Sequence, residues 1–132
     1  MRAVILDTDV FSFVFKRDSR AELYSSSMTG AQPCLSFQSV AELRFWALAR
    51  RWSESRRQGL DTSIAQCVVI PYDDAMAKIW AEICVNRRQI GRPIECGDAW
   101  IAAAALRHQC TLLTHNAKDY AGIPDLKIIS FA

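Results

Sequence analysis

Acidic side chains stand at four separated points of this sequence, each beside an apolar run of strand or helix type. Carboxylates that meet in one hollow at separations of about 4 to 6 Å repel each other by several kcal/mol. Such a cluster holds either protonated acids or a divalent cation, and oxygen ligands without histidine favour Mg²⁺ or Mn²⁺ over zinc. The candidate residues are Asp7, Glu42, Asp98 and Asp119, with Asp9, Thr114 and Asn116 as supporting polar neighbours.

Each aspartate also has an ordinary structural interpretation. An aspartate that precedes a helical segment fits a helix N-cap, as is the case for Asp7, Asp9 and Asp98. Asp119 fits an Asx-turn. Glu42 is different, because its helical neighbours Phe45 and Trp46 are apolar and offer no cation for an ion pair. We therefore expect Glu42 and Asp98 to be desolvated acids, and unpaired buried charges are costly unless they bind something.

Short apolar runs alternate with longer helical patterns along the whole chain. The runs that predict strands are 3–6, 33–37, 67–70, 111–114 and 126–130. The segments that predict helices are 10–16, 20–28, 38–51, 54–65, 74–90 and 98–108. This alternation predicts a three-layer α/β/α fold around a central, mostly parallel five-stranded sheet. Ligands of such sheets bind beyond the carboxyl ends of the strands, where the acids stand.

Composition narrows the class of protein. With 132 residues, 51% of them hydrophobic and 23% charged, we expect one folded domain over residues 1–132. The formal charge of +2 does not by itself indicate a nucleic-acid partner. Five scattered cysteines without a Cys-x-x-Cys pair indicate reduced thiols, and His115, without metal-ligand spacing, fits a surface loop. Without a signal-peptide pattern or an 18-residue apolar stretch, we expect a cytoplasmic protein with no membrane segment.

Four segments, in chain order, resemble the motifs of the PIN-domain ribonucleases, and most closely those of the VapC toxins of bacterial toxin–antitoxin pairs. These segments are 5–10, 39–43, 97–106 and 111–120. The resemblance implies a Mg²⁺- or Mn²⁺-dependent endoribonuclease that hydrolyses RNA phosphodiester bonds and leaves a 5′-phosphate. It further implies a homodimer and a cognate VapB-type antitoxin whose C-terminal segment reaches the acidic groove.

The resemblance also assigns roles to the acids. Asp7 and Asp98 match the first and third acids and are expected to bind the metal directly, while Glu42 binds it or orients the water. Asp119 matches a fourth acid with a second-metal or outer role, and Asn116 matches a polar position beside the metal. Asp9 departs from the pattern, which more often has Asn or Ser, and adds a negative charge.

An acidic site repels RNA, so the nuclease interpretation needs flanking cations. The candidate RNA-binding residues are Arg44, Arg50, Arg51, Arg87 and Arg92. Two alternatives remain open at this stage. The segment 4–9 also resembles the D-x-D signature of haloacid-dehalogenase phosphatases, with Asp7 as nucleophile and Asp9 as acid. A non-catalytic receiver-like binding module also fits the length, although Glu42 would then have no role.

Overall fold

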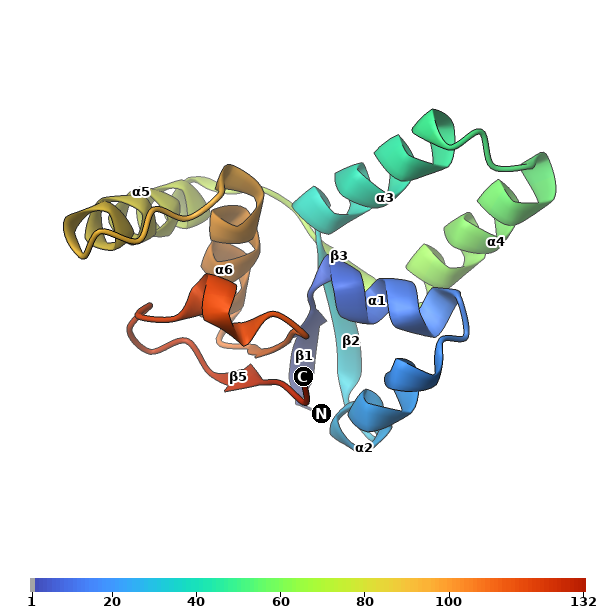
Figure 1. The fold of residues 1–132 in the computed structure, drawn as a ribbon, viewed down its shortest axis with the longest axis horizontal. Coiled ribbons are helices and arrows are strands. Elements are labelled where there is room, and N and C mark those ends of the chain that lie inside the picture. Colours follow the sequence, from blue (N-terminus) through green and yellow to red (C-terminus); the bar gives the residue numbers. More distant parts are fainter. Residues whose placement is uncertain (1) are drawn as a thin grey trace.

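The computed structural model describes residues 2–132 and is built on one five-stranded, all-parallel sheet of order β3-β2-β1-β4-β5 (Figure 1). The strands are β1 (Ala3–Leu6), β2 (Gln32–Ser36), β3 (Val68–Ile70), β4 (Thr111–Leu113) and β5 (Ile128–Ile129). Because every neighbouring pair is parallel, the carboxyl ends of all the strands lie along the same edge. The predicted α/β architecture is confirmed.

Helices cover both faces of the sheet and complete three layers. They are α1 (Thr8–Phe15), α2 (Ser25–Met28), α3 (Phe37–Ala49), α4 (Glu54–Ala65), α5 (Asp74–Gln89) and α6 (Cys96–His108). Ile5 of β1 packs in a core shared with α5 and α6, whereas its neighbours Val4 and Leu6 pack in a second core with α1, α3 and α4. This alternation is the two-residue period of a strand buried on both faces.

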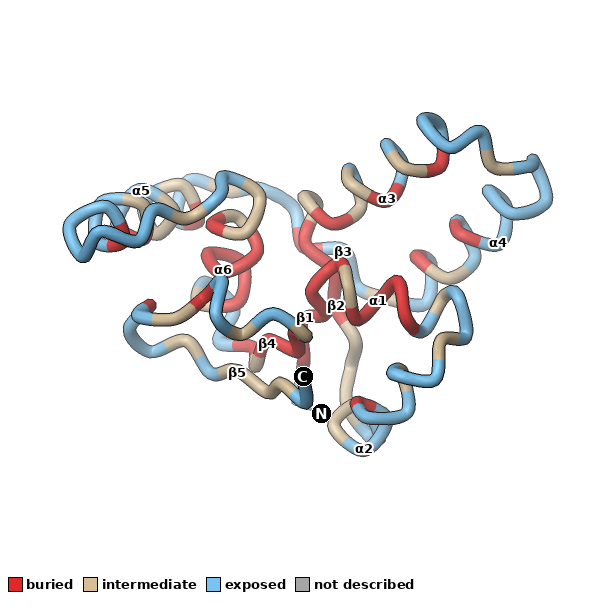
Figure 2. The backbone as a smooth tube through the Cα atoms, viewed as in Figure 1, coloured by how far each residue is buried: buried red, intermediate tan, exposed pale blue. Residues whose placement is uncertain are grey.

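Burial is deepest where the central strands meet α1 and α6 (Figure 2). Helix α6 is alanine-rich, and residues Ala102 to Ala105 are almost completely buried. Small side chains let this helix lie close to the sheet, so its first turn, which carries Asp98, is held firmly at the carboxyl edge. Asp98 is not the helix cap that its position had suggested, because α6 begins two residues earlier at Cys96 and Glu95 is the N-cap.

Several other predicted boundaries are also wrong. The segment 20–28 is not one helix but a 3₁₀ helix, η1 (Ser19–Tyr24), followed by the single turn α2, because buried Tyr24 anchors the chain between them. Phe37 begins α3 instead of ending β2, since the Ser36 side chain caps that helix by accepting the Gln38 N–H. The last strand shrinks to Ile128–Ile129 at the sheet edge.

Helices α3 and α4 extend from the sheet as an arm (Figure 1). Although α3 is rich in apolar residues, Phe45 is 66% and Leu48 is 68% exposed. The apolar character of α3 therefore reflects an uncovered surface and not the interior of this chain. Within residues 2–132, no helix combines the length and hydropathy that a bilayer span requires.

Candidate functional site

Asp7 lies at the carboxyl end of the central strand β1 and is also the N-cap of α1. Its Oδ1 accepts the N–H of Thr8 at 2.8 Å, and its Oδ2 accepts the hydroxyl of Thr114 at 2.7 Å. Thr114 follows the neighbouring strand β4 and is fully buried. The parallel pairing of β1 and β4 thus fixes the orientation of the Asp7 carboxylate from both sides.

Asp9 is held by the loop that follows β4. Its Oδ2 accepts the backbone N–H of His115 at 3.1 Å and the Nδ2 amide of Asn116 at 2.8 Å. The side chain of Asn116 is therefore engaged with Asp9, the acid that departs from the family pattern. His115 is not a free surface loop residue as expected, because its ring packs edge-on against Phe13 and its Nδ1 lies 2.6 Å from the hydroxyl of Tyr24.

Tyr120 joins the first and third acids, and sequence reasoning did not single it out. It ends the 3₁₀ helix η2 (Ala117–Tyr120), is 1% exposed, and its hydroxyl lies 3.4 Å from Oδ1 of Asp98. The same hydroxyl also acts on Asp7, where it lowers the pKa of the carboxyl group against the larger effect of burial. The available signal was an aromatic residue with a hydroxyl directly after Asp119, at the end of a segment already matched to the family.

Glu42 reaches this cluster from the amino-terminal half of α3. Gln38, one turn earlier, donates its Nε2 amide to Oε1 of Glu42 at 3.0 Å. Opposite them, α6 carries Gly97, whose missing Cβ would lie 3.1 Å from Oε1 of Glu42. The close approach of α3 and α6 therefore brings the Glu42 carboxylate beside the turn that bears Asp98.

Burial and neighbouring negative charges raise the pKa values of two of the acids. Burial, followed by the charge of Asp9, raises the pKa of Asp7 from 3.8 to about 7. Burial, followed by the charges of Asp119, Glu95 and Glu42, raises the pKa of Asp98 from 3.8 to about 6. Within residues 2–132, no lysine or arginine forms an ion pair with any of the four candidate acids. No basic side chain among the described residues therefore offsets the repulsion between these carboxylates, whereas a bound cation would offset it.

The donor chemistry of this cluster fits a hydrated divalent ion. In the described part of the chain, no three His, Cys, Asp or Glu side chains are arranged to hold a metal ion directly. Mg²⁺ does not require such a cage, because it keeps several of its waters and binds through one or two carboxylates. Asp7 and Asp98, which share the hydroxyl of Tyr120, offer such a pair.

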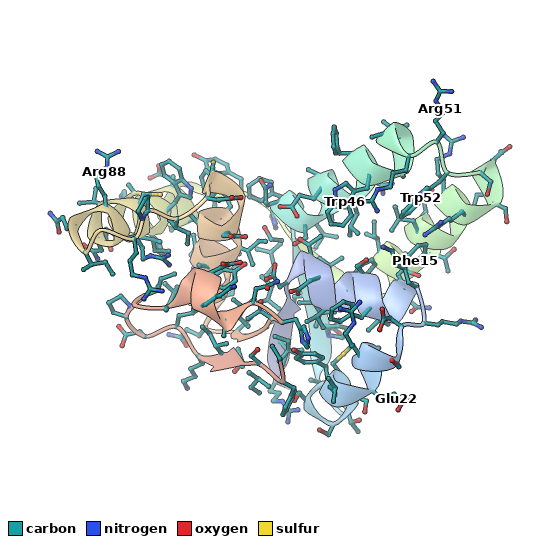
Figure 3. The ribbon with its side chains drawn as sticks, viewed as in Figure 1. Phe15, Glu22, Trp46, Arg51, Trp52 and Arg88 are labelled. Atoms are coloured by element: carbon teal, nitrogen blue, oxygen red, sulfur yellow. The ribbon has the colours of Figure 1, made fainter. Side chains whose placement is uncertain are left out.

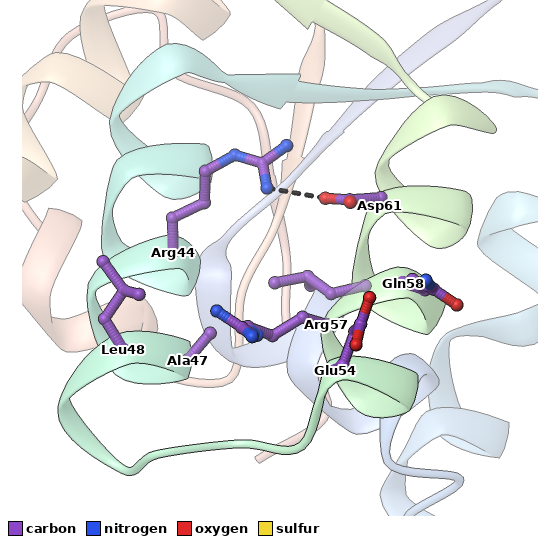
Figure 4. Close-up of a pocket in the computed structure, with 8 residues that line it drawn as sticks. Arg44, Ala47, Leu48, Glu54, Arg57, Gln58 and Asp61 are labelled. Carbon is purple, nitrogen blue, oxygen red and sulfur yellow. Dashed lines mark hydrogen bonds and ion pairs between the residues drawn. The ribbon is translucent and has the colours of Figure 1, made fainter.

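The candidate arginines separate into two groups. Arg87 and Arg92 line the same hollow as Asp98 and Asp119. The other three lie on the α3–α4 arm, where Arg51 points outward at the tip (Figure 3). There Arg44 pairs with Asp61 at 2.7 Å across the groove between the two helices (Figure 4), and Arg50 lies over the ring of Trp46.

The fold and the acidic edge agree with one family of proteins. The PIN domain family matches residues 4–125, and the chain belongs to this family. This assignment replaces the haloacid-dehalogenase and receiver alternatives.

Within this family, the chain is similar to proteins named as VapC ribonucleases and to solved VapBC and FitAcB structures. Ribonuclease VapC5 of Mycobacterium tuberculosis is 30% identical over 92% of this chain and 87% of its own length. Ribonuclease VapC4 of the same organism is 27% identical over 98% of both chains. Among solved structures, VapBC2 from Rickettsia felis bound to a promoter DNA fragment superposes with a TM-score of 0.86 at 21% identity, covering 98% of this chain and 99% of the other. FitAcB from Neisseria gonorrhoeae superposes with a TM-score of 0.80 at 26% identity and 96% coverage of both chains.

Proposed function

We propose that residues 1–132 form one nuclease domain, the toxin of a VapBC-type pair, which cuts RNA internally by hydrolysing phosphodiester bonds in the cytoplasm. The observation that carries this proposal is the buried hydroxyl of Tyr120, which joins Asp7 and Asp98 at the carboxyl edge of the sheet. Glu42 lies close to Asp98, and its negative charge contributes to the raised pKa of that carboxyl group. The relatives named as VapC ribonucleases support assigning these acids to RNA cleavage.

The acids would hold Mg²⁺ or Mn²⁺, with Asp7 and Asp98 as direct ligands and Glu42 and Asp119 as outer or additional ligands. Such an ion, when bound, supplies a water of lowered pKa and neutralises charge on the phosphoryl oxygens. Thr114 keeps the Asp7 carboxylate in one orientation through its 2.7 Å hydrogen bond. Glu42, oriented by Gln38, would bind the ion or orient the attacking water.

The partner of this toxin would be a VapB-type antitoxin, as in the complexes that resemble this chain. The arm formed by α3 and α4 offers it an apolar surface, because Phe45 and Leu48 are exposed and a groove lies between the two helices (Figure 4). A basic side chain of the antitoxin would satisfy the unpaired carboxylates through charge-assisted hydrogen bonds. We also propose that the toxin is a homodimer.

The test is cleavage of a structured RNA by purified protein with Mg²⁺ or Mn²⁺ and with a chelator. We expect metal-dependent internal cuts that leave 5′-phosphates, and loss of these cuts in Asp98→Asn. Asp125→Asn is the matched control, because Asp125 is an exposed acid in the loop before β5, and asparagine tolerates its φ of 64°. Cleavage that persists in Asp98→Asn, or that ignores the chelator, would reject the proposal.

A further inference from the structure

A hollow of about 580 Å³ lies directly beside the acid cluster. Its walls come from the loop between α5 and α6, from the first turn of α6 and from the 3₁₀ helix η2. Asp98 and Asp119 form one side of it, so the hollow is continuous with the proposed metal site. Three cationic residues, Arg87, Arg92 and Lys118, line the rest of it together with Pro93, Ile94 and a third acid, Glu95.

Arg87 is a buried cation that has no acidic partner in the described part of the chain. It is 4% exposed, its Nε donates to the carbonyl oxygen of Arg92 at 2.6 Å, and its Nη1 donates to the carbonyl oxygen of Asp119 at 2.8 Å. No ion pair between Arg87 and a carboxylate exists among residues 2–132. Carbonyl groups satisfy two of its donors but leave its full charge in the wall of the hollow, and a buried unpaired charge is costly.

The two hydrogen bonds of Arg87 also fix the geometry of the hollow. One holds the backbone at Arg92 and the other holds the backbone at Asp119, so the opposite walls are tied to the same guanidinium. Arg92 and Lys118 are exposed, and neither pairs with a carboxylate in the described part of the chain. Their ammonium and guanidinium groups are therefore free to meet an anion that enters from solvent.

We propose that this hollow is a phosphate subsite, in which Lys118 and Arg92 contact an RNA phosphodiester next to the one that is cut and Arg87 positions both walls. The inference rests on the proposed nuclease function and names how that site takes its substrate. Arginine and lysine are the side chains that bind phosphate oxygens through charge-assisted hydrogen bonds. A cationic subsite beside the acids lets a polyanion approach carboxylates that would otherwise repel it.

The test measures binding without chemistry. A fluorescent single-stranded 12-nucleotide RNA is titrated with protein in chelator, over a series of salt concentrations. Each lost phosphate contact on a single strand lowers the slope of log affinity against log salt by about 0.7. We expect that reduction in Lys118→Ala and in Arg92→Ala, with weaker binding that does not depend on the RNA sequence.

Two matched controls separate this subsite from general surface charge. Lys127→Ala removes an exposed lysine at the amino end of β5, at the opposite edge of the sheet from the acids. Arg88→Ala removes the arginine next to Arg87 in the chain, which points outward from α5 (Figure 3). Both controls are expected to keep the wild-type salt slope. A Lys118→Ala or Arg92→Ala slope equal to that of the controls would overturn the proposed subsite.

Cleavage assays with Mn²⁺ distinguish the two proposals. If wild-type protein does not cut RNA while both variants still lower the salt slope, the subsite stands and the nuclease function fails. If wild-type protein cuts RNA and the slopes do not change, the nuclease stands and the subsite fails. An RNA analogue with a neutral methylphosphonate backbone is expected to bind equally to wild type and Lys118→Ala; a difference there would show that Lys118 contacts something other than phosphate.

Discussion

The hydroxyl of Thr114 donates a 2.7 Å hydrogen bond to Oδ2 of Asp7, joining the ends of two adjacent parallel strands. Both residues are buried. Asp7 is proposed as a direct metal ligand, and Thr114 is not a ligand itself. The role of Thr114 is to orient the Asp7 carboxylate.

Replacement of Thr114 by valine removes this hydrogen bond, and the one that Oγ1 of Thr114 accepts from the Asn116 N–H at 3.0 Å, with little change in shape. We expect Thr114→Val to weaken Mn²⁺ binding and RNA cleavage by about 10- to 100-fold, the usual effect of losing a group that orients a metal ligand. Calorimetric titration with Mn²⁺ measures the first effect. Thr114→Ser keeps the hydroxyl and is expected to stay near wild type; an equal loss in both variants would assign the effect to packing.

The stability of the metal-free protein should fall as pH rises through the weakly acidic range. The pKa of Asp7 is about 7 in the folded state and 3.8 as the reference value, so between these limits the native protein keeps a proton that the unfolded chain loses. Asp98, with a pKa raised to about 6, acts in the same direction. Urea unfolding in chelator from about pH 4 to about pH 8 measures this slope.

Asp7→Asn should flatten the pH dependence, because the amide does not titrate. Asp125→Asn, the exposed control, should leave the dependence as in wild type. Saturating Mg²⁺ should also reduce it, since the ion stabilises the charged carboxylates. Stability of the wild type that increases across this pH range in chelator would contradict the proposed burial of two unpaired acids.

Removal of the Tyr120 hydroxyl should weaken metal binding in a pH-dependent manner. Hydrogen bonds from this hydroxyl lower the pKa of both Asp7 and Asp98 against the opposing effect of burial. In Tyr120→Phe both pKa values rise further, so a metal ion must displace more protons near neutral pH. We expect Mn²⁺ affinity to fall several-fold at pH 6.5 and much less at pH 8.5.

The control for this variant is Tyr72→Phe, because Tyr72 is 56% exposed and its hydroxyl contacts none of the acids. Calorimetric titration with Mn²⁺ in the absence of RNA gives the affinity at each pH. Phenylalanine fills the same core volume, and the folded state should therefore be retained. An affinity deficit of Tyr120→Phe that is equal at both pH values would mean that the hydroxyl acts by another route.

The fold and the meeting of the acids could be predicted because they follow from local patterns. Short apolar strands separated by helices define a parallel sheet, and that sheet gathers strand-end residues such as Asp7 and Thr114 at one edge. The interpretation of Glu42 as a desolvated acid relied on its apolar neighbours Phe45 and Trp46. Phe45 and Leu48 are in fact exposed, and Glu42 lies beside Asp98 because the sheet-proximal end of α3 meets α6.

Long-range contacts of single side chains could not be predicted. Arg87 lies in a basic stretch that resembles a solvated helix face, yet it is buried, because the helix turns that residue toward the carbonyl groups of Arg92 and Asp119. The contact between the Tyr120 hydroxyl and Asp98 likewise depends on the path of η2, which the sequence pattern does not reveal. Periodicity shows which face of an element is apolar, but not which polar atom of a distant loop will meet it.

A substitution at Gly97 tests whether the position of Glu42 matters, and it does so without removing any carboxylate. A Cβ at this position would lie 2.9 Å from Nε2 of Gln38 and 3.1 Å from Oε1 of Glu42. Both atoms are at the far ends of flexible side chains, so Gly97→Ala should displace them without disturbing the backbone. Alanine also favours the helix by about 1 kcal/mol over glycine, and stability should be unchanged or higher.

We therefore expect Gly97→Ala to fold normally and to lose most of its RNA cleavage, because the Glu42 carboxylate no longer faces the first turn of α6. The matched control is Gly59→Ala in α4, where the nearest atom to an added Cβ is 3.9 Å away in Phe15. Thermal unfolding and cleavage rates are measured for both variants. Wild-type cleavage in Gly97→Ala would show that the position of Glu42 does not matter to the reaction, whereas a stable, inactive variant beside an active Gly59→Ala would locate the defect in the contact between α3 and α6.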